Sequence, residues 1–571
     1  MPTSAEVQAQ LTGPGGPFEV VTEPVLGRPM RVYKQRLRSL REVPALAAAR
    51  GDEQPHIVFG ERRIGFSEFV SAANGVSRSL SEGFGIGRGD RVAVLSANNP
   101  EWCLTFWGTV DLGAVLVGLN GWWKADEILF GLQDSGARVL VADAARLARI
   151  ADRLSECPQL ETVFLVDGAQ DPEDARVQRF ARLLAEPGPE LPSGPIDEDD
   201  PAVIFYTSGT TGRPKGAVST HRSMVANLQN TFYNAVSGSL ANPDAGGPAV
   251  GGQSQAVSLL TSPLFHVSGC HSGIVVGLAG GVRLVMPTGR FDPENAMRLI
   301  ERERVSVWAA VPTMVWRVVE HPDRHNHDLS SVTTVAYGGS PSAGELQRRV
   351  KETFPSVRTL GNAYGLTESS SVATVNYGQE FIDRPESVGR PLPVVEIRVV
   401  DDKGNEQGIG QLGEVCIRGP IVMPGYWNRP DATAEVLRDG WLFTGDLGYL
   451  DEDGYLYITD RAKDMIIRGG ENVYCVEIEN RLVEHPRIAE AAVVGIPHPT
   501  LGEEVKAVVR PEPGATVSAD EVRAWVKKTL ADFKAPAHVE FVQEPLPRNP
   551  SGKLLKNVLR GQGEVSFAET L

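Results

Sequence analysis

The sequence predicts an α/β protein with a large N-terminal domain, a β-rich subdomain at its end, and a small α+β C-terminal domain. Three observations lead to this prediction. Short apolar segments rich in β-branched residues alternate with amphipathic segments over most of the chain, as in βαβ units with parallel sheets. Near residues 390–460 the pattern changes to short strands separated by turns. A further unit of about 110 residues follows Asp460.

In the α/β part, each expected element comes from a local pattern. Amphipathic periodicity predicts helices at 67–82 and 293–304. Apolar runs predict buried strands at 91–95, 138–142, 162–166, 202–205, 282–285 and 305–308. A capped helix is expected from Ser219 to about Val236. Residues 237–254 are rich in Gly, Ser, Pro and Ala, which predicts a flexible surface insertion.

The last third is predicted from shorter signals. Strands are expected at 396–400 and 413–418, with turns at Asp402–Gly404 and Asp453–Gly454. The C-terminal unit should contain helices at 476–483 and 519–530 and strands at 491–494, 505–509 and 539–542. The predicted domains are therefore 1–461 and 462–571, with the β-rich subdomain at about 390–460.

Composition narrows the classes of function. The net charge is 56 − 72 = −16, which argues against nucleic acid as the main partner. The five cysteines are scattered and form no C-x-x-C pair, which predicts a reduced, cytoplasmic protein without a cysteine metal cage. No signal peptide and no apolar run of membrane-spanning length is expected. The oligomeric state stays open, a homodimer included.

Residues 206–216 read Tyr-Thr-Ser-Gly-Thr-Thr-Gly-Arg-Pro-Lys-Gly, a composition suited to polyphosphate. Glycines let the backbone approach an anion, and N–H groups and hydroxyls donate to phosphate oxygens. Lys215 adds a positive charge. A strand, this loop and then a helix would be a common way to hold phosphate. No Ser or Thr follows Lys215, so the loop is not a P-loop NTPase motif; a mobile surface loop is the alternative.

Further motifs occur along the chain. They are Tyr337-Gly-Gly-Ser-Pro341, Asn362-Ala-Tyr-Gly-Leu-Thr-Glu368, Gly440-Trp-Leu-Phe-Thr-Gly-Asp446, Asp460-Arg-Ala-Lys-Asp464, Gly469-Gly-Glu-Asn-Val-Tyr474 and Pro547-Arg-Asn-Pro-Ser-Gly-Lys553. Over roughly residues 40–560 these motifs and their order resemble the adenylate-forming acyl-CoA synthetases. That superfamily also holds nonribosomal peptide adenylation domains and beetle luciferases.

The resemblance implies a two-step reaction with ATP, Mg²⁺ and coenzyme A. A carboxylic acid and ATP first give an acyl-adenylate and pyrophosphate. A thiol, usually that of coenzyme A, then displaces AMP to give a thioester. The resemblance also implies that the C-terminal domain is mobile and rotates between the two steps about a hinge at Lys463, which brings Gly469 and Gly470 towards the coenzyme A path.

Roles for individual residues follow from the resemblance. The catalytic residues would be Lys553, which bridges the carboxylate and the α-phosphate, Thr367, which contacts phosphate, and Glu368, the Mg²⁺ ligand. Tyr364 would stack on adenine, and Asp446 would accept the ribose hydroxyls. The full nucleotide-binding set is Thr207, Ser208, Gly209, Thr210, Thr211, Lys215, Gly339, Ser340, Asn362, Tyr364, Asp446 and Arg461. A surface lysine, a helix-start carboxylate, a turn-forming Asp and a core Tyr are the alternatives for Lys553, Glu368, Asp446 and Tyr364.

The acid is expected to contact His266, Val267, Gly338 and Gly365, although His266 could equally be a core histidine. Apolar walls and the lack of a second recognition charge favour a hydrophobic acid, either a medium- or long-chain fatty acid or a bulky terpenoid or steroid acid. The expected walls are Phe265, Val267, Trp308 and Val311, with room left by Gly269, Gly273, Gly338 and Gly339.

Two departures and two competing functions remain. Cys475 replaces the family's usual Pro or Ser, and a buried small residue is favoured over a reactive thiol. Ile467 stands where luciferases carry a second-step lysine, so light emission is not expected. An adenylation enzyme that loads a carrier protein in trans is one alternative. A nucleotide-binding scaffold without catalysis is the other, and the intact Lys553, Glu368 and Asp446 argue against it.

Overall fold

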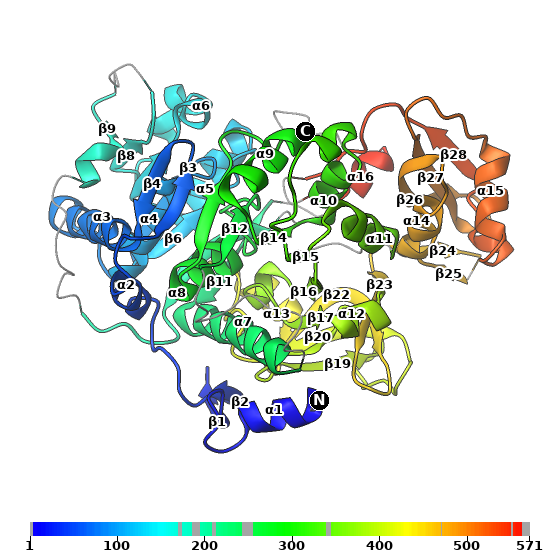
Figure 1. The fold of residues 1–571 in the computed structure, drawn as a ribbon, viewed down its shortest axis with the longest axis horizontal. Helices are drawn as coiled ribbons and strands as arrows, with labels where there is room; N and C mark the ends of the chain where they lie inside the picture. The colour runs from blue at the N-terminus through cyan, green and yellow to red at the C-terminus, as the bar shows by residue number, and fades with distance from the viewer. Residues whose placement is uncertain are drawn as a thin grey trace.

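The computed structural model describes residues 4–168, 174–184, 194–207, 213–241, 255–338, 344–469, 471–549 and 552–561. It confirms the predicted α/β class, with a large N-terminal domain and a small C-terminal domain (Figure 1). The described strands form four sheets of five or more strands and one short hairpin.

A seven-stranded sheet has the order β11-β10-β6-β5-β7-β8-β9. Its strands are β5 (Arg91–Leu95), β6 (Val115–Gly118), β7 (Val139–Ala142), β8 (Thr162–Leu165), β9 (Val177–Arg179), β10 (Pro201–Thr207) and β11 (Lys215–Thr220). All neighbours are parallel except β10 and β11. Helices α4 (Pro100–Asp111) and α5 (Ala125–Ser135) connect its strands, and α3 (Phe66–Arg78) precedes β5.

The glycine-rich loop is not followed directly by a helix, as the sequence had suggested. It connects β10 to β11 in an antiparallel hairpin, where Thr207 lies opposite Lys215. Only then does helix α7 (His221–Ala241) begin. The segment Gly216–Val218 forms a strand because its backbone pairs with Ile204–Tyr206, and this tertiary pairing overrides the weak local signal.

A nine-stranded sheet has the order β18-β17-β16-β15-β14-β12-β13-β3-β4. Its strands are β3 (Pro55–Phe59), β4 (Arg62–Gly65), β12 (Val257–Leu260), β13 (Arg283–Met286), β14 (Val307–Ala310), β15 (Thr334–Gly338), β16 (Thr359–Tyr364), β17 (Thr374–Tyr377) and β18 (Arg390–Pro391). The six from β3 to β16 are parallel. Helices α8 (Val276–Gly280), α9 (Pro293–Glu303), α10 (Pro312–Val319) and α11 (Gly344–Thr353) connect them.

The β-rich sheet contains β19 (Glu396–Val400), β20 (Gly413–Arg418), β21 (Leu437–Arg438), β22 (Trp441–Leu450) and β23 (Leu456–Arg461). Its two predicted strands are confirmed at their predicted bounds. The C-terminal unit contains β24 (Ile466–Arg468), β25 (Glu471–Val473), β26 (Ile488–His498), β27 (Gly502–Pro511) and β28 (His538–Phe541). Helices α14 (Cys475–Val483) and α15 (Ala519–Lys527) pack on this sheet, and α16 (Lys556–Leu559) follows. In Figure 1 this unit lies at the right, beside α10 and α11.

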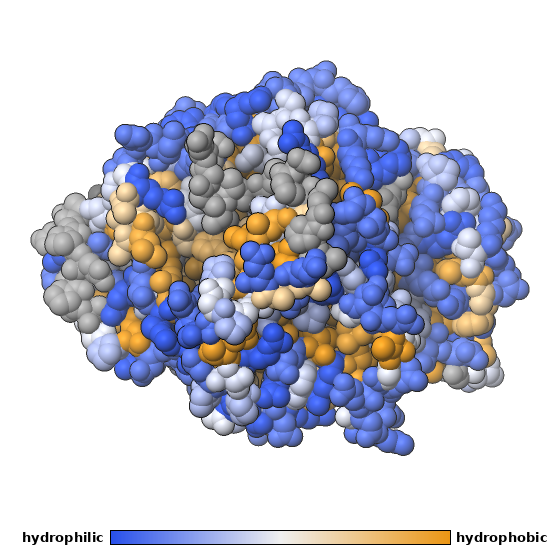
Figure 2. Space-filling view, turned by 60° about the horizontal axis from the view of Figure 1, so that its bottom comes forward, coloured by the Kyte–Doolittle hydropathy of each residue, from blue (hydrophilic) through white to orange (hydrophobic). Residues whose placement is uncertain are grey.

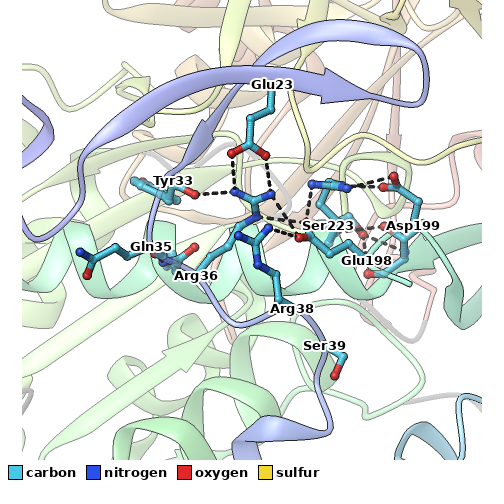
Figure 3. A network of polar contacts seen from close by, with 12 residues as sticks. Glu23, Tyr33, Gln35, Arg36, Arg38, Ser39, Glu198, Asp199 and Ser223 are labelled. Atoms are coloured by element: carbon cyan, nitrogen blue, oxygen red, sulfur yellow. Dashed lines mark hydrogen bonds and ion pairs between the residues drawn. The ribbon is translucent and has the colours of Figure 1, made fainter. Parts of the chain in front are cut away.

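The N-terminal segment is attached to the start of α7 by a network of charged side chains (Figure 3). The hairpin of β1 (Val20–Val25) and β2 (Arg28–Tyr33) leads into it. Arg36, which is nearly buried, donates to Glu23 at 2.7 Å and to Glu198 at 3.0 Å. Glu198 also pairs with Arg38 and Arg222. Buried charges require such partners. The network therefore fixes the N-terminal hairpin against α7, the helix that lines one side of the cavity described below.

Figure 2 shows charged and polar residues over much of one face, interrupted by apolar areas. None of the helices in the described ranges has both the length and the apolar character needed to cross a bilayer.

Candidate active site

A continuous cavity of about 670 Å³ lies between the nine-stranded sheet, α7 and the β-rich sheet, and the loop that carries Lys553 reaches into it. Its lining brings together predicted residues from distant parts of the chain. They are Thr207, Lys215, His266, Val267, Gly338, Asn362, Tyr364, Gly365, Thr367, Glu368, Arg461, Lys463 and Lys553.

The other predicted residues do not line the cavity or are not described. Asp446 lies directly behind Tyr364 and Arg461, and Gly469 hydrogen-bonds to Leu501 instead. Ser208, Gly209, Thr210, Thr211, Gly339, Ser340 and Gly470 lie outside the described residues.

The parallel strands explain why these residues meet. Strand β14 ends just before Val311, β15 ends at Gly338, and β16 ends at Tyr364. Ligands of open α/β sheets bind beyond the carboxyl ends of the strands. The motif Asn362–Glu368 begins in the last residues of β16 and continues beyond its end, so Glu368 lies at this edge.

Lys553 enters the cavity on a tight loop of the C-terminal domain. Lys553 N–H donates to Asn549 Oδ1 at 2.9 Å, and Asn549 N–H donates to the Lys553 carbonyl at 2.8 Å. Gly552 has φ = +80°, and a Cβ there would lie 2.7 Å from Thr313 Oγ1, so only glycine lets this loop pack against α10.

Among the charged groups of the site, the Lys553 ammonium has an unusual environment. Within the described parts of the chain it makes no hydrogen bond and no ion pair. Burial lowers the pKa of Lys553 to about 8, and the nearby Arg461 adds to this lowering. A desolvated cation without a partner favours binding of an anion.

Glu368 has the environment expected for a Mg²⁺ ligand. Tyr426 Oη donates to Glu368 Oε1 at 2.8 Å. The other oxygen, Oε2, takes part in no hydrogen bond or ion pair with the described residues. Mg²⁺ is held in proteins by one or two carboxylates together with phosphate oxygens, so a single carboxylate with one free oxygen can serve as its protein ligand.

Asp446 lies inside β22, and not at a turn after a strand as the sequence suggested. Gly445 has φ = +71°, and Thr444–Asp446 form a bulge opposite Val415. The bulge aims the carboxylate at two partners. Tyr364 Oη donates to Asp446 Oδ2 at 2.7 Å, and Arg461 Nε lies 3.1 Å from Oδ1. Tyr364 is thereby fixed at the cavity wall beside Asn362, whose amide makes no hydrogen bond to the described residues.

The far part of the cavity lies on one face of the nine-stranded sheet. Ala309, Ala336 and Gly361 lie side by side on adjacent strands and all line the cavity. Ala309 is exposed although its strand is paired on both sides. Leu260 and Tyr377 continue this row at its two ends. Strands are spaced about 4.8 Å apart, so this floor of small residues is about 10 Å wide.

Two of the expected wall residues are elsewhere. Trp308 is fully buried on the opposite face of β14, because successive strand residues point to opposite faces. Phe265 is buried and does not line the cavity, whereas Val267 and Val311 do. His266 also lines it, and burial lowers the pKa of His266 to about 4, with Lys553 contributing.

The glycines near His266 do not create the space that was expected of them. A Cβ on Gly269 would lie 2.2 Å from the Pro263 carbonyl oxygen, and one on Gly273 would lie 2.8 Å from Leu260 Cδ1. These glycines allow close packing. The room comes instead from the small floor residues Ala309, Ala336 and Gly361. Cys475 is buried as predicted, and its thiol donates to the Asp464 carbonyl.

Two family models match the chain. Residues 45–427 match the AMP-binding enzyme model, and residues 477–553 match the AMP-binding enzyme C-terminal domain. The chain is 37% identical over 482 residues to a feruloyl-CoA synthase of an Amycolatopsis species, which covers 83% of this chain and 89% of that protein.

It is 35% identical over 538 residues to a 3-[(3aS,4S,7aS)-7a-methyl-1,5-dioxo-octahydro-1H-inden-4-yl]propanoyl:CoA ligase of Rhodococcus jostii, covering 90% of this chain and 96% of that protein. The fold of the present chain matches that of the anthranilate CoA ligase AuaEII bound to anthranoyl-AMP, with a TM-score of 0.81. The two are 25% identical, and the match covers 92% of this chain and 96% of that one. The chain therefore belongs to the adenylate-forming AMP-binding enzymes and is an AMP-forming acid–CoA ligase that uses ATP, Mg²⁺ and coenzyme A.

Proposed function

We propose that this enzyme forms the coenzyme A thioester of a hydrophobic carboxylic acid with a bulky, ring-containing body. One observation carries the proposal: a single cavity joins the ammonium of Lys553, which has no partner in the described part of the chain, to the broad floor formed by Ala309, Ala336 and Gly361. The ammonium suits a carboxylate, and the floor is wider than a single alkyl chain requires. The ring-bearing acid named for the Rhodococcus relative supports this choice.

In the proposed first step, a carboxylate oxygen of the acid attacks the α-phosphorus of ATP. The new O–P bond forms as the bond to the pyrophosphate oxygen breaks, and pyrophosphate leaves. Lys553 holds the carboxylate and the α-phosphate together. Because these groups are both anionic, a preorganised cation between them lowers the barrier by a few kcal/mol.

We assign the remaining first-step roles from the family resemblance, several of them to residues of the cavity lining. Tyr364 and Asn362 hold adenine, and the Asp446–Arg461 pair receives the ribose. Lys215, Thr207 and the loop Ser208–Thr211 bind the outgoing phosphates, with Gly339 and Ser340 beside the nucleotide. Thr367 and Glu368 would hold Mg²⁺ and its phosphate oxygens; when bound, this ion neutralises phosphate charge.

In the proposed second step, the sulfur of coenzyme A attacks the acyl carbonyl and AMP leaves. We place the domain boundary at residues 461/462 and the hinge at Lys463. Gly469 now binds Leu501 and lies outside the cavity, so it must move if it and Gly470 are to border the thiol path. A rotation of the C-terminal domain that withdraws Lys553 from the cavity would also bring Gly469 and Gly470 towards it.

All five cysteines are buried and none forms a disulfide, which supports a cytoplasmic location, since thiols stay reduced there.

The test of this function is a panel of acids in two assays, ATP–pyrophosphate exchange and thioester formation with coenzyme A. We expect aryl-alkanoic and fused-ring acids to give the highest kcat/KM, ahead of straight-chain acids of equal carbon number. Preference for straight chains would overturn the ring assignment. Transfer to an acyl carrier protein, but not to coenzyme A, would favour the carrier-loading alternative.

Filling the floor provides a more direct test. Ala309→Phe projects a ring into the cavity and should lower kcat/KM for ring-bearing acids at least about tenfold, the order of effect expected for one badly placed group. Propionate and ATP should keep their KM values, because they do not reach the floor. An equal loss for all acids would show that the substitution acts on the fold.

A further inference from the structure

The turn directly after Glu368 is strained and buried. Ser370 has φ = +50° and Ser371 has φ = +108°, which L-residues rarely adopt. Ser370 is fully buried and Ser371 nearly so. Strain of this kind persists only when surrounding contacts impose it, and it collects at functional sites.

Four side chains hold this turn. Ser370 Oγ donates to Ser223 Oγ at 2.9 Å and lies 3.2 Å from Ser219 Oγ. His271 Nδ1 lies 3.1 Å from the Ser370 carbonyl oxygen. Ser272 Oγ and Ser371 Oγ are 2.7 Å apart. Two of these contacts come from α7 and the strand before it, and the other two come from one short helical segment.

The His271 contact has a defined polarity. A carbonyl oxygen only accepts, so Nδ1 must carry the hydrogen. His271 is fully buried, and burial lowers its pKa to about 4. The neutral Nδ1–H ring therefore donates to the turn, while it stacks on Phe205 at a centroid distance of 5.5 Å.

The same segment forms part of the acid side of the cavity. The N–H groups of His271 and Ser272 donate to the Val267 carbonyl at 2.9 and 3.1 Å. Val267, Ser272 and Ser371 all line the cavity. The segment Cys270–Val275 is a π-helix, a rare form that is frequent at functional sites.

The Ser370–Ser371 turn also determines where Glu368 lies. Ser371 N–H donates to the Leu366 carbonyl at 3.2 Å, and Ser370 N–H donates to the Thr367 carbonyl at 3.1 Å. A Cβ on Gly365 would lie 1.6 Å from the Ser371 carbonyl oxygen. Any shift of Ser370 and Ser371 is therefore passed to Thr367 and Glu368.

We propose that His271 and Ser272 are positioning residues that hold the strained Ser370–Ser371 turn, and that they couple acid binding at Val267 to the alignment of Glu368 for Mg·ATP. The inference rests on the proposed role of Glu368 as the Mg²⁺ ligand. It adds two residues from a different segment of the chain, Cys270–Val275.

The test compares His271→Leu, which fills the space without a donor, with His271→Asn, whose side-chain N–H can replace Nδ1–H. Calorimetry with α,β-methylene-ATP, whose bond between the α- and β-phosphates is not cleaved and which therefore transfers no adenylyl group to the acid, gives the dissociation constant with and without Mg²⁺. We expect His271→Leu to lose about 10- to 100-fold of the Mg²⁺-dependent tightening, the usual effect of removing a partner that orients a metal ligand. His271→Asn should retain most of it at a similar melting temperature.

Ser272→Ala removes one hydroxyl and so serves if His271→Leu does not fold. In the wild type an acid substrate should tighten binding of Mg²⁺ and the ATP analogue, and in Ser272→Ala this coupling should weaken. Equal Mg²⁺ responses in wild type, His271→Leu and Ser272→Ala would overturn the inference, as would equal losses in the Leu and Asn variants. Glu368→Gln separates the two claims: if it keeps the full Mg²⁺ response, the role proposed for Glu368 is wrong.

Discussion

At the scale of single residues, Lys553 is the strongest indication of chemistry. The backbone of its loop is fixed by Asn549, and its ammonium is desolvated without a partner among the residues that the structure describes. Most lysines project into solvent because burying an unpaired charge is costly. The proposed function accounts for this position, since a bound carboxylate and phosphate would supply partners for the ammonium.

The lowered pKa of Lys553 predicts the pH dependence of the first step. In the proposed first step the protonated ammonium binds the anionic substrates. The kcat/KM for pyrophosphate exchange should therefore be constant below pH 8 and fall about tenfold per pH unit above it. This parameter is the appropriate one because kcat/KM reports the pKa of the free enzyme. Bound anions raise this pKa, so kcat should fall at higher pH. The exchange assay contains no coenzyme A, whose thiol would titrate nearby.

Lys553→Arg is the control for this profile. Its guanidinium stays charged, so the fall above pH 8 should disappear, whatever the absolute rate. A wild-type fall that persists unchanged in Lys553→Arg would assign the titration to another group. His266 is not that group, because burial lowers the pKa of His266 to about 4.

At the scale of elements, the buried parallel strands were the easiest to predict. Strand β5 has its predicted bounds, and β7 and β8 differ from theirs by one residue at one end, because strands buried on both faces are continuous apolar runs. Strand β11 was missed, since Lys215–Thr220 becomes a strand only by pairing with β10. The sequence also shows no difference between Ala309, which faces the cavity, and any small core residue. That distinction depends on which sheet face α7 covers.

The bulge at Asp446 depends on one glycine. The sequence shows a turn signal at Gly445–Asp446, and in the structure the left-handed backbone of Gly445 lets the strand bulge and orients Asp446. Gly445 has φ = +71°, and a Cβ added there would meet no atom of the described residues within 4 Å. Gly445→Ala should therefore introduce no clash, but it places an L-residue in the left-handed region at a cost of about 1–2 kcal/mol. Part of this strain should be relieved by flattening the bulge, which moves Asp446. We expect the KM for ATP to rise several-fold.

The matched control is Gly454→Ala. Gly454 has φ = +78°, an equally open surrounding, and lies in the turn between β22 and β23, away from the cavity lining. Urea denaturation should show a similar loss of stability for both variants, and only Gly445→Ala should change the KM for ATP. Equal KM values would mean that the bulge does not position the ribose-binding pair.

At the scale of the whole molecule, one cavity is assembled from both domains. The lining extends from Thr207 to Lys553, and the C-terminal loop packs on α10 through Gly552. This arrangement places Lys553 beside Arg461, as the first step requires. In this arrangement Gly469 does not line the cavity, and its N–H donates to the Leu501 carbonyl at 2.8 Å. The second step that we propose uses a different arrangement of the same two domains, with the backbone change at Lys463, where the chain passes from β23 to β24.

Lys463→Pro tests this hinge. Proline fixes φ and restricts the residue before it, so it should hinder the rotation more than it disturbs the present arrangement. We expect pyrophosphate exchange to stay within about threefold of wild type, while thioester formation from supplied acyl-adenylate slows at least about tenfold, because hinge restriction acts on the conformational step. Lys463→Ala removes the same side chain without restricting the backbone and should affect both rates equally. Lys553→Ala should show the reverse pattern, losing exchange but retaining thioester formation. If exchange and thioester formation fall in parallel in Lys463→Pro, the hinge is not at this residue.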